Sequence, residues 1–279
     1  MEEKYRRRRA QRQAKMLRRL IVRLVLVLSL LCGAAALVAA KRPEPASTAP
    51  KEPPSTTFAP TLGELPSTAP ATTQPKQETP EDFFDDAVFL GDSVTMALRN
   101  YCMETGALGQ AQFLCAGNYA VRHAVAQPGQ GDVVSVTWQG KAVTPAEAIT
   151  QTGARKVFLL LGLNDIVFGL DWAMENWAVL VENIHSRCPG VVVYIQSATP
   201  VTAAFEGAKL NNRTIDAYNG QLQAFAWEHG CHYIDVASAL KEKTGALAAD
   251  FCSDGKCHLS RAGVQAWIEL LRQQTEAWG

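Results

Sequence analysis

The chain of 279 residues is poor in histidine and has no net charge. Only five histidines are present, and their spacing to the cysteines matches no strong zinc-binding pattern. The 27 basic residues are balanced by 27 acidic residues, so the chain as a whole lacks the positive charge typical of nucleic-acid-binding proteins. A catalytic histidine must therefore come from a short set of candidates, and we expect no metal.

The zero net charge conceals an uneven distribution along the chain. Ten basic residues lie in the first 23 positions, whereas residues 81–279 contain 13 basic and 21 acidic residues. That region carries a net charge of −8 and offers no basic surface to a nucleic acid. We expect no nucleic-acid partner for it.

The N-terminal residues predict a membrane anchor. Residues 1–19 form a basic tail, and residues 20–40 are apolar except for Arg23. The apolar segment is long enough to cross a bilayer as a helix. Because basic flanks stay in the cytoplasm, we expect one transmembrane helix or uncleaved signal anchor over 20–40 and an extracellular C-terminal part. The alternative is a cleaved signal peptide, since residues 38–40 (Val-Ala-Ala) resemble a cleavage site.

Residues 41–80 predict a stalk. The segment 43–80 holds ten of the fourteen prolines and eleven serines or threonines, and such a composition cannot bury a core. We expect a disordered stalk that holds residues 81–279 away from the membrane, within a cell wall.

Six of the seven cysteines lie in the expected exported part. An even number in an oxidising compartment is compatible with disulfides, and the candidate pairs are Cys188 with Cys231 and Cys252 with Cys257. Two sets of residues offer a metal site as the alternative. They are Cys252, Cys257 and His258, and His229, Cys231 and His232.

Residues 81–279 predict one α/β domain. Five short apolar runs are typical of strands: 87–90, 111–115, 156–161, 191–196 and 232–236. Helical patterns separate them, at 94–104, 145–152, 171–187, 212–229 and 261–277. This alternation predicts a parallel sheet covered on both faces. The stretch 127–144, with a Gln139-Gly140 turn, is compatible with an added hairpin.

Polar residues follow the predicted strands and should share the carboxyl-end rim of the sheet. Ser93 stands where the first strand turns into a helix, which is where such sheets expose a nucleophile. The Ser93 amide, the Gly117 amide and the Asn164 side chain can surround an oxyanion formed there. The alternative for each position is a turn or a helix cap.

The predicted base for Ser93 is His258. It lies in the loop after the last strand, and the carboxylate of Asp254 can hold its Nδ1 proton. His123 is a second candidate, and Asp165 and Asp235 are alternative partners. The remaining histidines precede strands and should lie at the amino-end rim: His185, His229 and His232.

These motifs resemble the SGNH/GDSL hydrolase family. The four blocks stand in the family's order, with Gly91-Asp92-Ser93, then Gly117, then residues 162–165 (Gly-Leu-Asn-Asp), then Asp254 with His258. The resemblance implies a flavodoxin-like three-layer α/β/α sandwich with a five-stranded parallel sheet, the catalytic roles named above, and no metal or organic cofactor. In the family Asp stands three residues before His, whereas here the spacing is four. The chain also lacks the Gly-x-Ser-x-Gly elbow of α/β-hydrolases.

The resemblance further implies hydrolysis of an acyl ester through an acyl-enzyme on Ser93. With the predicted anchor and stalk, it favours removal of O-acetyl groups from carbohydrate or cell-wall polymers. Transfer of the acyl group to a sugar hydroxyl is the first alternative. A wall-binding module without turnover is the second.

Overall fold

The computed structural model describes residues 79–278 of the chain. The predicted tail at 1–19, the span at 20–40 and nearly all of the stalk at 41–80 lie outside the described residues. Within residues 79–278, no helix combines the length and the apolar character needed to cross a membrane.

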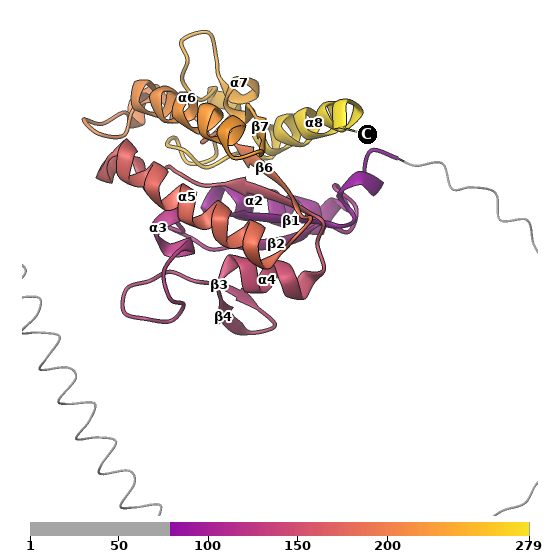
Figure 1. The fold of residues 1–279 in the computed structure, drawn as a ribbon. Coiled ribbons are helices and arrows are strands. Elements are labelled where there is room, and N and C mark those ends of the chain that lie inside the picture. Colours follow the sequence, from indigo (N-terminus) through magenta and orange to yellow (C-terminus); the bar gives the residue numbers. More distant parts are fainter. Residues whose placement is uncertain (1–78, 279) are drawn as a thin grey trace, which may run out of the picture. The chain divides into compact units, whose positions relative to one another are not determined.

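A five-stranded parallel sheet forms the centre of the domain (Figure 1). Its strands are β1 (Ala87–Gly91), β2 (Gln112–Cys115), β5 (Lys156–Leu160), β6 (Val192–Gln196) and β7 (His232–Ile234). They lie in the order β2-β1-β5-β6-β7, and every neighbouring pair is parallel. From β1 the chain continues to β2 at one edge of the sheet, and it later returns to form β5 on the other side of β1. The carboxyl ends of β1 and β5 therefore frame the switch point at which such sheets bind ligands.

Helices cover both faces of the sheet, which confirms the three-layer α/β/α prediction. One layer contains α4 (Pro145–Thr152), α5 (Leu170–Arg187) and α6 (Asn212–Glu228), in front of the sheet in Figure 1. Behind it, α2 (Ser93–Thr105) packs against α8 (Arg261–Trp278). The sequence did not predict two short helices, α3 (Val121–Ala124) and α7 (Val236–Leu240).

The expected hairpin is present. It comprises β3 (Val136–Trp138) and β4 (Lys141–Val143), which pair antiparallel. Gln139 and Gly140 between them have φ values of 49° and 76°, the left-handed conformation of a type I′ turn. The last strand is shorter than the predicted 232–236. It ends at Ile234 because Asp235 accepts a hydrogen bond from the Ser238 amide and starts α7.

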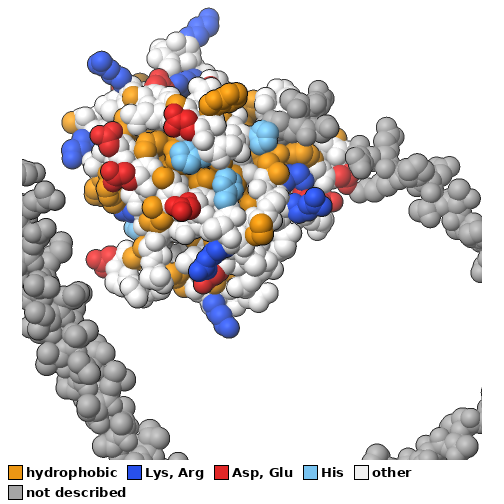
Figure 2. Space-filling model, in the orientation of Figure 1, with side chains coloured by type: hydrophobic (Ala, Val, Ile, Leu, Met, Phe, Trp, Pro, Cys, Tyr) orange, Lys and Arg blue, Asp and Glu red, His pale blue; other side chains and the backbone are white. Residues whose placement is uncertain are grey.

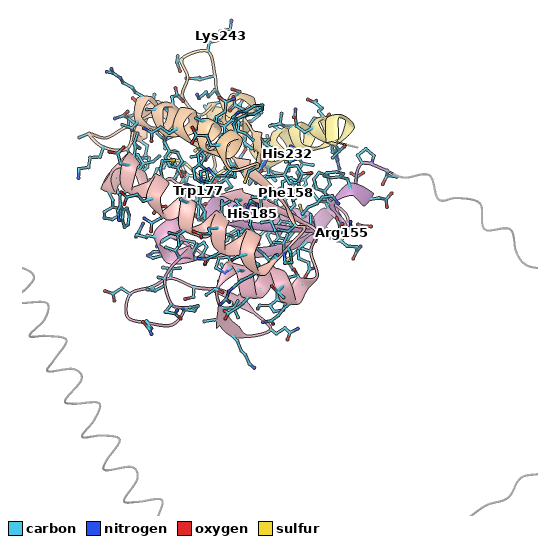
Figure 3. The ribbon with its side chains drawn as sticks, in the orientation of Figure 1. Arg155, Phe158, Trp177, His185, His232 and Lys243 are labelled. Carbon is cyan, nitrogen blue, oxygen red and sulfur yellow. The ribbon has the colours of Figure 1, made fainter. Side chains whose placement is uncertain are left out.

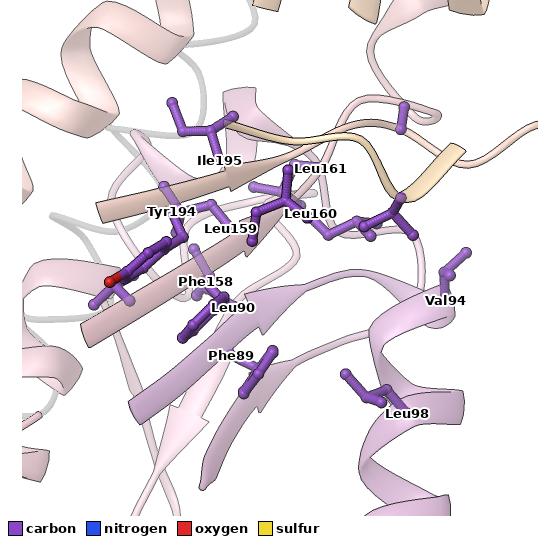
Figure 4. Packing of buried hydrophobic residues seen from close by; sticks show 14 of the residues in the cluster. Phe89, Leu90, Val94, Leu98, Phe158, Leu159, Leu160, Leu161, Tyr194 and Ile195 are labelled. Carbon is purple, nitrogen blue, oxygen red and sulfur yellow. The ribbon is translucent and has the colours of Figure 1, made fainter. Parts of the chain in front are cut away.

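Aromatic side chains on three adjacent strands form one stack in the core (Figure 4). The rings of Phe89 and Phe158 are 4.6 Å apart, and those of Phe158 and Tyr194 are 4.5 Å apart. Val94 and Leu98 of α2 are fully buried nearby. On the same face of the sheet, two residues after Tyr194, Gln196 Oε1 accepts a hydrogen bond from Trp267 of α8 at 2.8 Å. The stack joins the side chains of three strands that are paired in register, and the hydrogen bond connects α8 to β6.

All six cysteines of residues 79–278 are free thiols, so the predicted disulfide pairs are wrong. The Cys188 thiol donates to Ala146 O, and Cys231 donates to His229 O. Cys252 donates to the carboxylate of Asp254. The sequence places these cysteines near strand ends and loops, but the thiols of Cys188, Cys231 and Cys252 each bond to a different local acceptor instead of a partner thiol.

Candidate active site

Ser93 is the first residue of α2, directly after β1. Asp92 caps this helix by accepting the Val94 amide at 2.9 Å. Gly91 makes the sharp turn possible, because a Cβ at that position would lie 1.9 Å from Thr95 Oγ1 and 2.7 Å from Leu160 O. The side chain of Ser93 is half-buried at the start of the helix. The turn thus presents a hydroxyl beside the positive end of the helix dipole.

His258 lies within hydrogen-bonding distance of this hydroxyl. Its Nε2 is 3.0 Å from Ser93 Oγ, and its Nδ1 is 2.6 Å from Asp254 Oδ2. A carboxylate can only accept at Nδ1, so the proton of a neutral imidazole lies there and Nε2 accepts from the serine. The structure therefore brings together the three residues that the sequence nominated as nucleophile, base and carboxylate.

The four-residue spacing between Asp254 and His258 is accommodated by a tight loop. Asp254 Oδ1 accepts the backbone amides of Lys256, Cys257 and His258, at 2.8, 3.1 and 3.2 Å. Gly255 has a φ of 71°, a left-handed value that favours glycine within this turn. Partial burial opposes ionisation of Asp254, but the hydrogen bonds from His258 and the backbone outweigh it and hold its pKa well below the usual range.

The alternative residues have other contacts. Asp165 accepts the Val121 amide at 2.9 Å and an N–H of Arg122, and Asp235 caps α7. His123 lies on α3 and its Nδ1 is buried without a hydrogen-bond partner in the described residues. Within residues 79–278, none of the three is hydrogen-bonded to the His258 ring or to Ser93 Oγ.

The remaining histidines lie where the sequence placed them, away from the carboxyl-end rim. Figure 2 shows histidines on the side where α5 and α6 lie, and Figure 3 labels His185 of α5 and His232 at the start of β7. His229 Nδ1 bonds to Phe225 O at 2.9 Å. The His232 ring stacks on Tyr194.

One group of possible metal ligands occurs in residues 79–278, and it lies in the triad loop. The ligand atoms of Asp254, Cys257 and His258 lie within 4.8 Å of one another. Burial raises the pKa of the Cys257 thiol to about 11, whereas metals bind the thiolate. The Nδ1 of His258 is already bonded to Asp254. These donors suit the triad better than a metal site.

Asn164 lies beside the Ser93 turn, but its amide group is already engaged. Its Nδ2 donates to Asp92 Oδ2 at 3.1 Å and to Tyr119 O at 3.0 Å. A side-chain amide has two N–H hydrogens, so both are used. Asn164 can donate to an oxyanion only if it exchanges one of these bonds when the substrate binds.

The other two predicted donors are backbone amides. Gly117 is exposed and is followed by Asn118 with a φ of 57°, so the chain turns sharply after β2. Neither the Gly117 amide nor the Ser93 amide has an acceptor in the part of the chain that the structure describes. Both remain available to a ligand.

Asp92 has a larger part in the site than the sequence indicated. It is 1% exposed and connects the Ser93 turn to Asn164. Burial raises the pKa of Asp92 to about 6. The Val94 amide and His258 lower this pKa, and the neighbouring Asp165 raises it slightly, but burial has the largest effect. The sequence identified it only as part of the turn.

Two further contributors could not be read from the sequence. Arg122 donates from Nη1 to Asn164 O at 2.6 Å, across 42 positions of sequence. Tyr218 packs so closely on Gly162 that a Cβ there would lie 2.4 Å from its ring, and Gly162 has a φ of 140°. Trp177 holds that tyrosine with a 2.6 Å hydrogen bond. These contacts fix the loop that carries Asn164.

A three-layer α/β domain with a Ser–His–Asp hydrogen-bond chain at its switch point is a hydrolase of the serine class. The model of the GDSL-like lipase/acylhydrolase family matches residues 89–266, and the chain belongs to this family of carboxylic ester hydrolases.

Solved structures share the fold at low sequence identity. A GDSL-like lipase from Bacteroides thetaiotaomicron is 15% identical with a TM-score of 0.51, and the match covers 69% of this chain and 88% of the other. The lipopolysaccharide acetyltransferase periplasmic domain of Salmonella ser. Paratyphi A is 14% identical with a TM-score of 0.50, covering 68% and 84%. A comparison with curated proteins finds no match. At these identities the likeness extends to the fold alone.

Proposed function

We propose that this acylhydrolase removes O-acyl groups, chiefly acetyl, from carbohydrate or cell-wall polymers through an acyl-enzyme on Ser93. The observation that carries the proposal is the hydrogen-bond chain from Ser93 Oγ through His258 to Asp254. It supplies an activated nucleophile and an oriented base without a cofactor.

The proposed chemistry has two half-reactions. His258 Nε2 takes the proton of Ser93 as Oγ attacks the ester carbonyl, and the amides of Ser93 and Gly117 donate to the developing oxyanion. When the intermediate collapses, the sugar oxygen leaves with the proton from Nε2. Water then attacks the acyl-enzyme with the same base, and acetate leaves.

The carbohydrate substrate is supported by the N-terminal sequence. A basic tail, an apolar span at 20–40 and a proline-rich stalk at 41–80 suit a single-pass membrane protein whose catalytic domain faces the cell wall. We propose this localisation together with the substrate.

Transfer of the acyl group to a second sugar is the alternative reaction. The fold shared with the acetyltransferase periplasmic domain is compatible with either outcome. The two reactions differ only in whether water or a sugar hydroxyl accepts the acyl group from Ser93.

The test measures acetate released from O-acetylated oligosaccharides by the full-length protein in mild detergent. We expect release to fall about 10⁴-fold or more in Ser93→Ala. Ser186→Ala is the matched control, because its hydroxyl donates only to Asn183 O near the end of α5. If the acetyl group passes mainly to an added sugar, the protein is a transferase. Glycan binding without any turnover would support the wall-binding module.

A further inference from the structure

Three exposed aromatic side chains lie on the segments that follow β5 and β6. Phe168 is 61% exposed, Trp172 39% and Phe205 37%. Of the other exposed large apolar side chains of the described residues, Val179 and Trp227 lie farther along α5 and α6, and Met103 and Val192 lie on α2 and β6. The amino ends of α5 and α6 lie at the same left-hand edge in Figure 1. Apolar surface gathered beside a reactive centre indicates a binding site. We call these three residues the rim aromatics.

These side chains form two surfaces, one from Phe168 with Trp172 and one from Phe205, and each surface has a cation at its border. The Arg122 guanidinium lies 4.7 Å from the centre of the Phe168 ring, and Lys256 Nζ lies 5.8 Å from that of Phe205. The Phe168 and Trp172 rings meet edge-on at 5.8 Å. Each surface therefore combines an apolar ring with N–H donors.

Both surfaces connect directly to the reacting groups. On one side, Arg122 donates to Asn164 O, and Asn164 donates to Asp92 beside the nucleophile. On the other, the Lys256 carbonyl in the triad loop accepts the Thr202 amide at 2.8 Å, just before the 3₁₀ helix Ala203–Phe205. Hydrogen bonds thus connect both surfaces to the site at Ser93.

Most carboxylates on these segments are occupied within the protein. Asp165 accepts from Val121 and Arg122, and Glu206 accepts from the backbone and side chain of Asn212. Asp254 holds His258. Asp171, beside Trp172, is exposed and makes no ion pair or hydrogen bond within the described residues. Arg122 uses Nη1 for Asn164 O and Asp165, so its other N–H groups, and Lys256 Nζ, remain to donate outward to oxygen acceptors.

We propose that the rim aromatics form a glycan subsite that holds sugar units next to the acylated sugar at Ser93. This inference rests on the proposed function and names how its substrate is recognised. A pyranose ring presents C–H groups that suit the negative face of an aromatic ring, while its oxygens accept from Arg122 and Lys256. The subsite therefore selects an O-acetylated oligosaccharide over a single acetylated sugar or a lipid ester.

The test compares kcat/KM of the full-length protein on four esters. They are O-acetylated xylotetraose, O-acetylated chitotetraose, 4-nitrophenyl acetate and 4-nitrophenyl dodecanoate. In Phe168→Ala, Trp172→Ala and Phe205→Ala, we expect the loss on a tetrasaccharide to exceed the loss on 4-nitrophenyl acetate by about tenfold, mainly through KM. Trp227→Ala is the control, since that side chain is 87% exposed at the far end of α6.

Several results would overturn the subsite. One is an equal loss on all four esters, since that reports general damage to the site. Another is a selective loss on the dodecanoate, which identifies an acyl-chain surface. A third is unchanged kinetics on both tetrasaccharides. Phe168→Tyr keeps an aromatic face and should recover most of the activity that Phe168→Ala loses.

A binding measurement separates the subsite from the proposed function. Ser93→Ala should bind the deacetylated tetrasaccharides, and adding Phe168→Ala should weaken that binding about tenfold. If this holds while the wild type releases no acetate from glycans, the subsite stands and the proposed reaction fails. If the wild type releases acetate from glycans but Phe168→Ala does not weaken tetrasaccharide binding, the subsite is refuted and the proposed reaction stands.

Discussion

Replacing the buried Asp92 by asparagine should make the protein more stable and less active at neutral pH. Burial raises the pKa of this carboxyl from 3.8 to about 6. A carboxyl whose folded pKa is raised favours the folded state when protonated, and that stability is lost as pH rises through the folded pKa. At 1.36 kcal/mol per unit, ionised Asp92 costs about 3 kcal/mol above pH 6.

Asparagine removes this cost but also removes one hydrogen bond. Oδ1 of the asparagine can still accept the Val94 amide. Its Nδ2, however, replaces the Oδ2 that accepts from Asn164 Nδ2, and two N–H donors then face each other. That loss costs about 1 kcal/mol, so Asp92→Asn should be about 2 kcal/mol more stable than wild type at pH 8. At pH 4, where the aspartate is mostly neutral, the variant should be slightly less stable.

The assay is urea unfolding followed by tryptophan fluorescence at pH values from 4 to 8. The difference in unfolding free energy between variant and wild type should change by about 2.5 kcal/mol across this range. Asp132→Asn, at an exposed position, serves as control and should differ little from wild type at every pH. A difference that does not vary with pH refutes the buried-charge argument.

The same substitution should slow turnover. Asp92 Oδ2 is one of two acceptors that orient Asn164, and without it the amide next to Ser93 is free to turn. We expect kcat on 4-nitrophenyl acetate to fall about tenfold at pH 7, less than the effect of removing an oxyanion donor outright. Stability and activity should therefore change in opposite directions.

Further expectations concern the triad, the Asn164 loop and the thiols. Asp254→Asn should lower kcat about 10⁴-fold with little change in KM, because His258 Nδ1 loses its acceptor. Kinetics on 4-nitrophenyl acetate will check this, and an effect on KM alone would contradict it. Gly162→Ala should lower the unfolding free energy by about 2–4 kcal/mol in urea unfolding, because the added Cβ would lie 2.4 Å from the Tyr218 ring. Gly153→Ala is the control. Its φ of 70° strains an alanine, but the added Cβ meets no other atom, so it should cost only about 1 kcal/mol. Thermal midpoints with and without a thiol reductant should agree because the six cysteines are free; a lower midpoint in reductant means that a disulfide exists.

Local patterns were enough to predict the sheet and its carboxyl-end rim. The apolar runs that became β1, β5 and β6 are buried along almost their whole length, and such runs are typical of central parallel strands. Strand polarity then predicted that Ser93, Asn164 and His258 lie at one rim. Its position near His258 also favoured Asp254 as the carboxylate, with Asp165 and Asp235 as alternatives.

Contacts between distant segments could not be predicted. Arg122 and Asp165 meet across 43 positions, and no periodic pattern marks either residue. The double engagement of Asn164 depends on the Tyr119 carbonyl, and a backbone oxygen has no sequence signature. The disulfide prediction failed for a related reason, because an even cysteine count says nothing about the distances between thiols.

The two ends of the domain meet at the Ser93–His258 hydrogen bond, which spans 165 positions. A growing chain leaves the ribosome with its nucleophile first and its base almost last. If the domain is exported as it is made, no hydrolytic site exists on the cytoplasmic side of the membrane at any time. With the localisation that we propose, the order of these residues along the chain would then protect cytoplasmic esters.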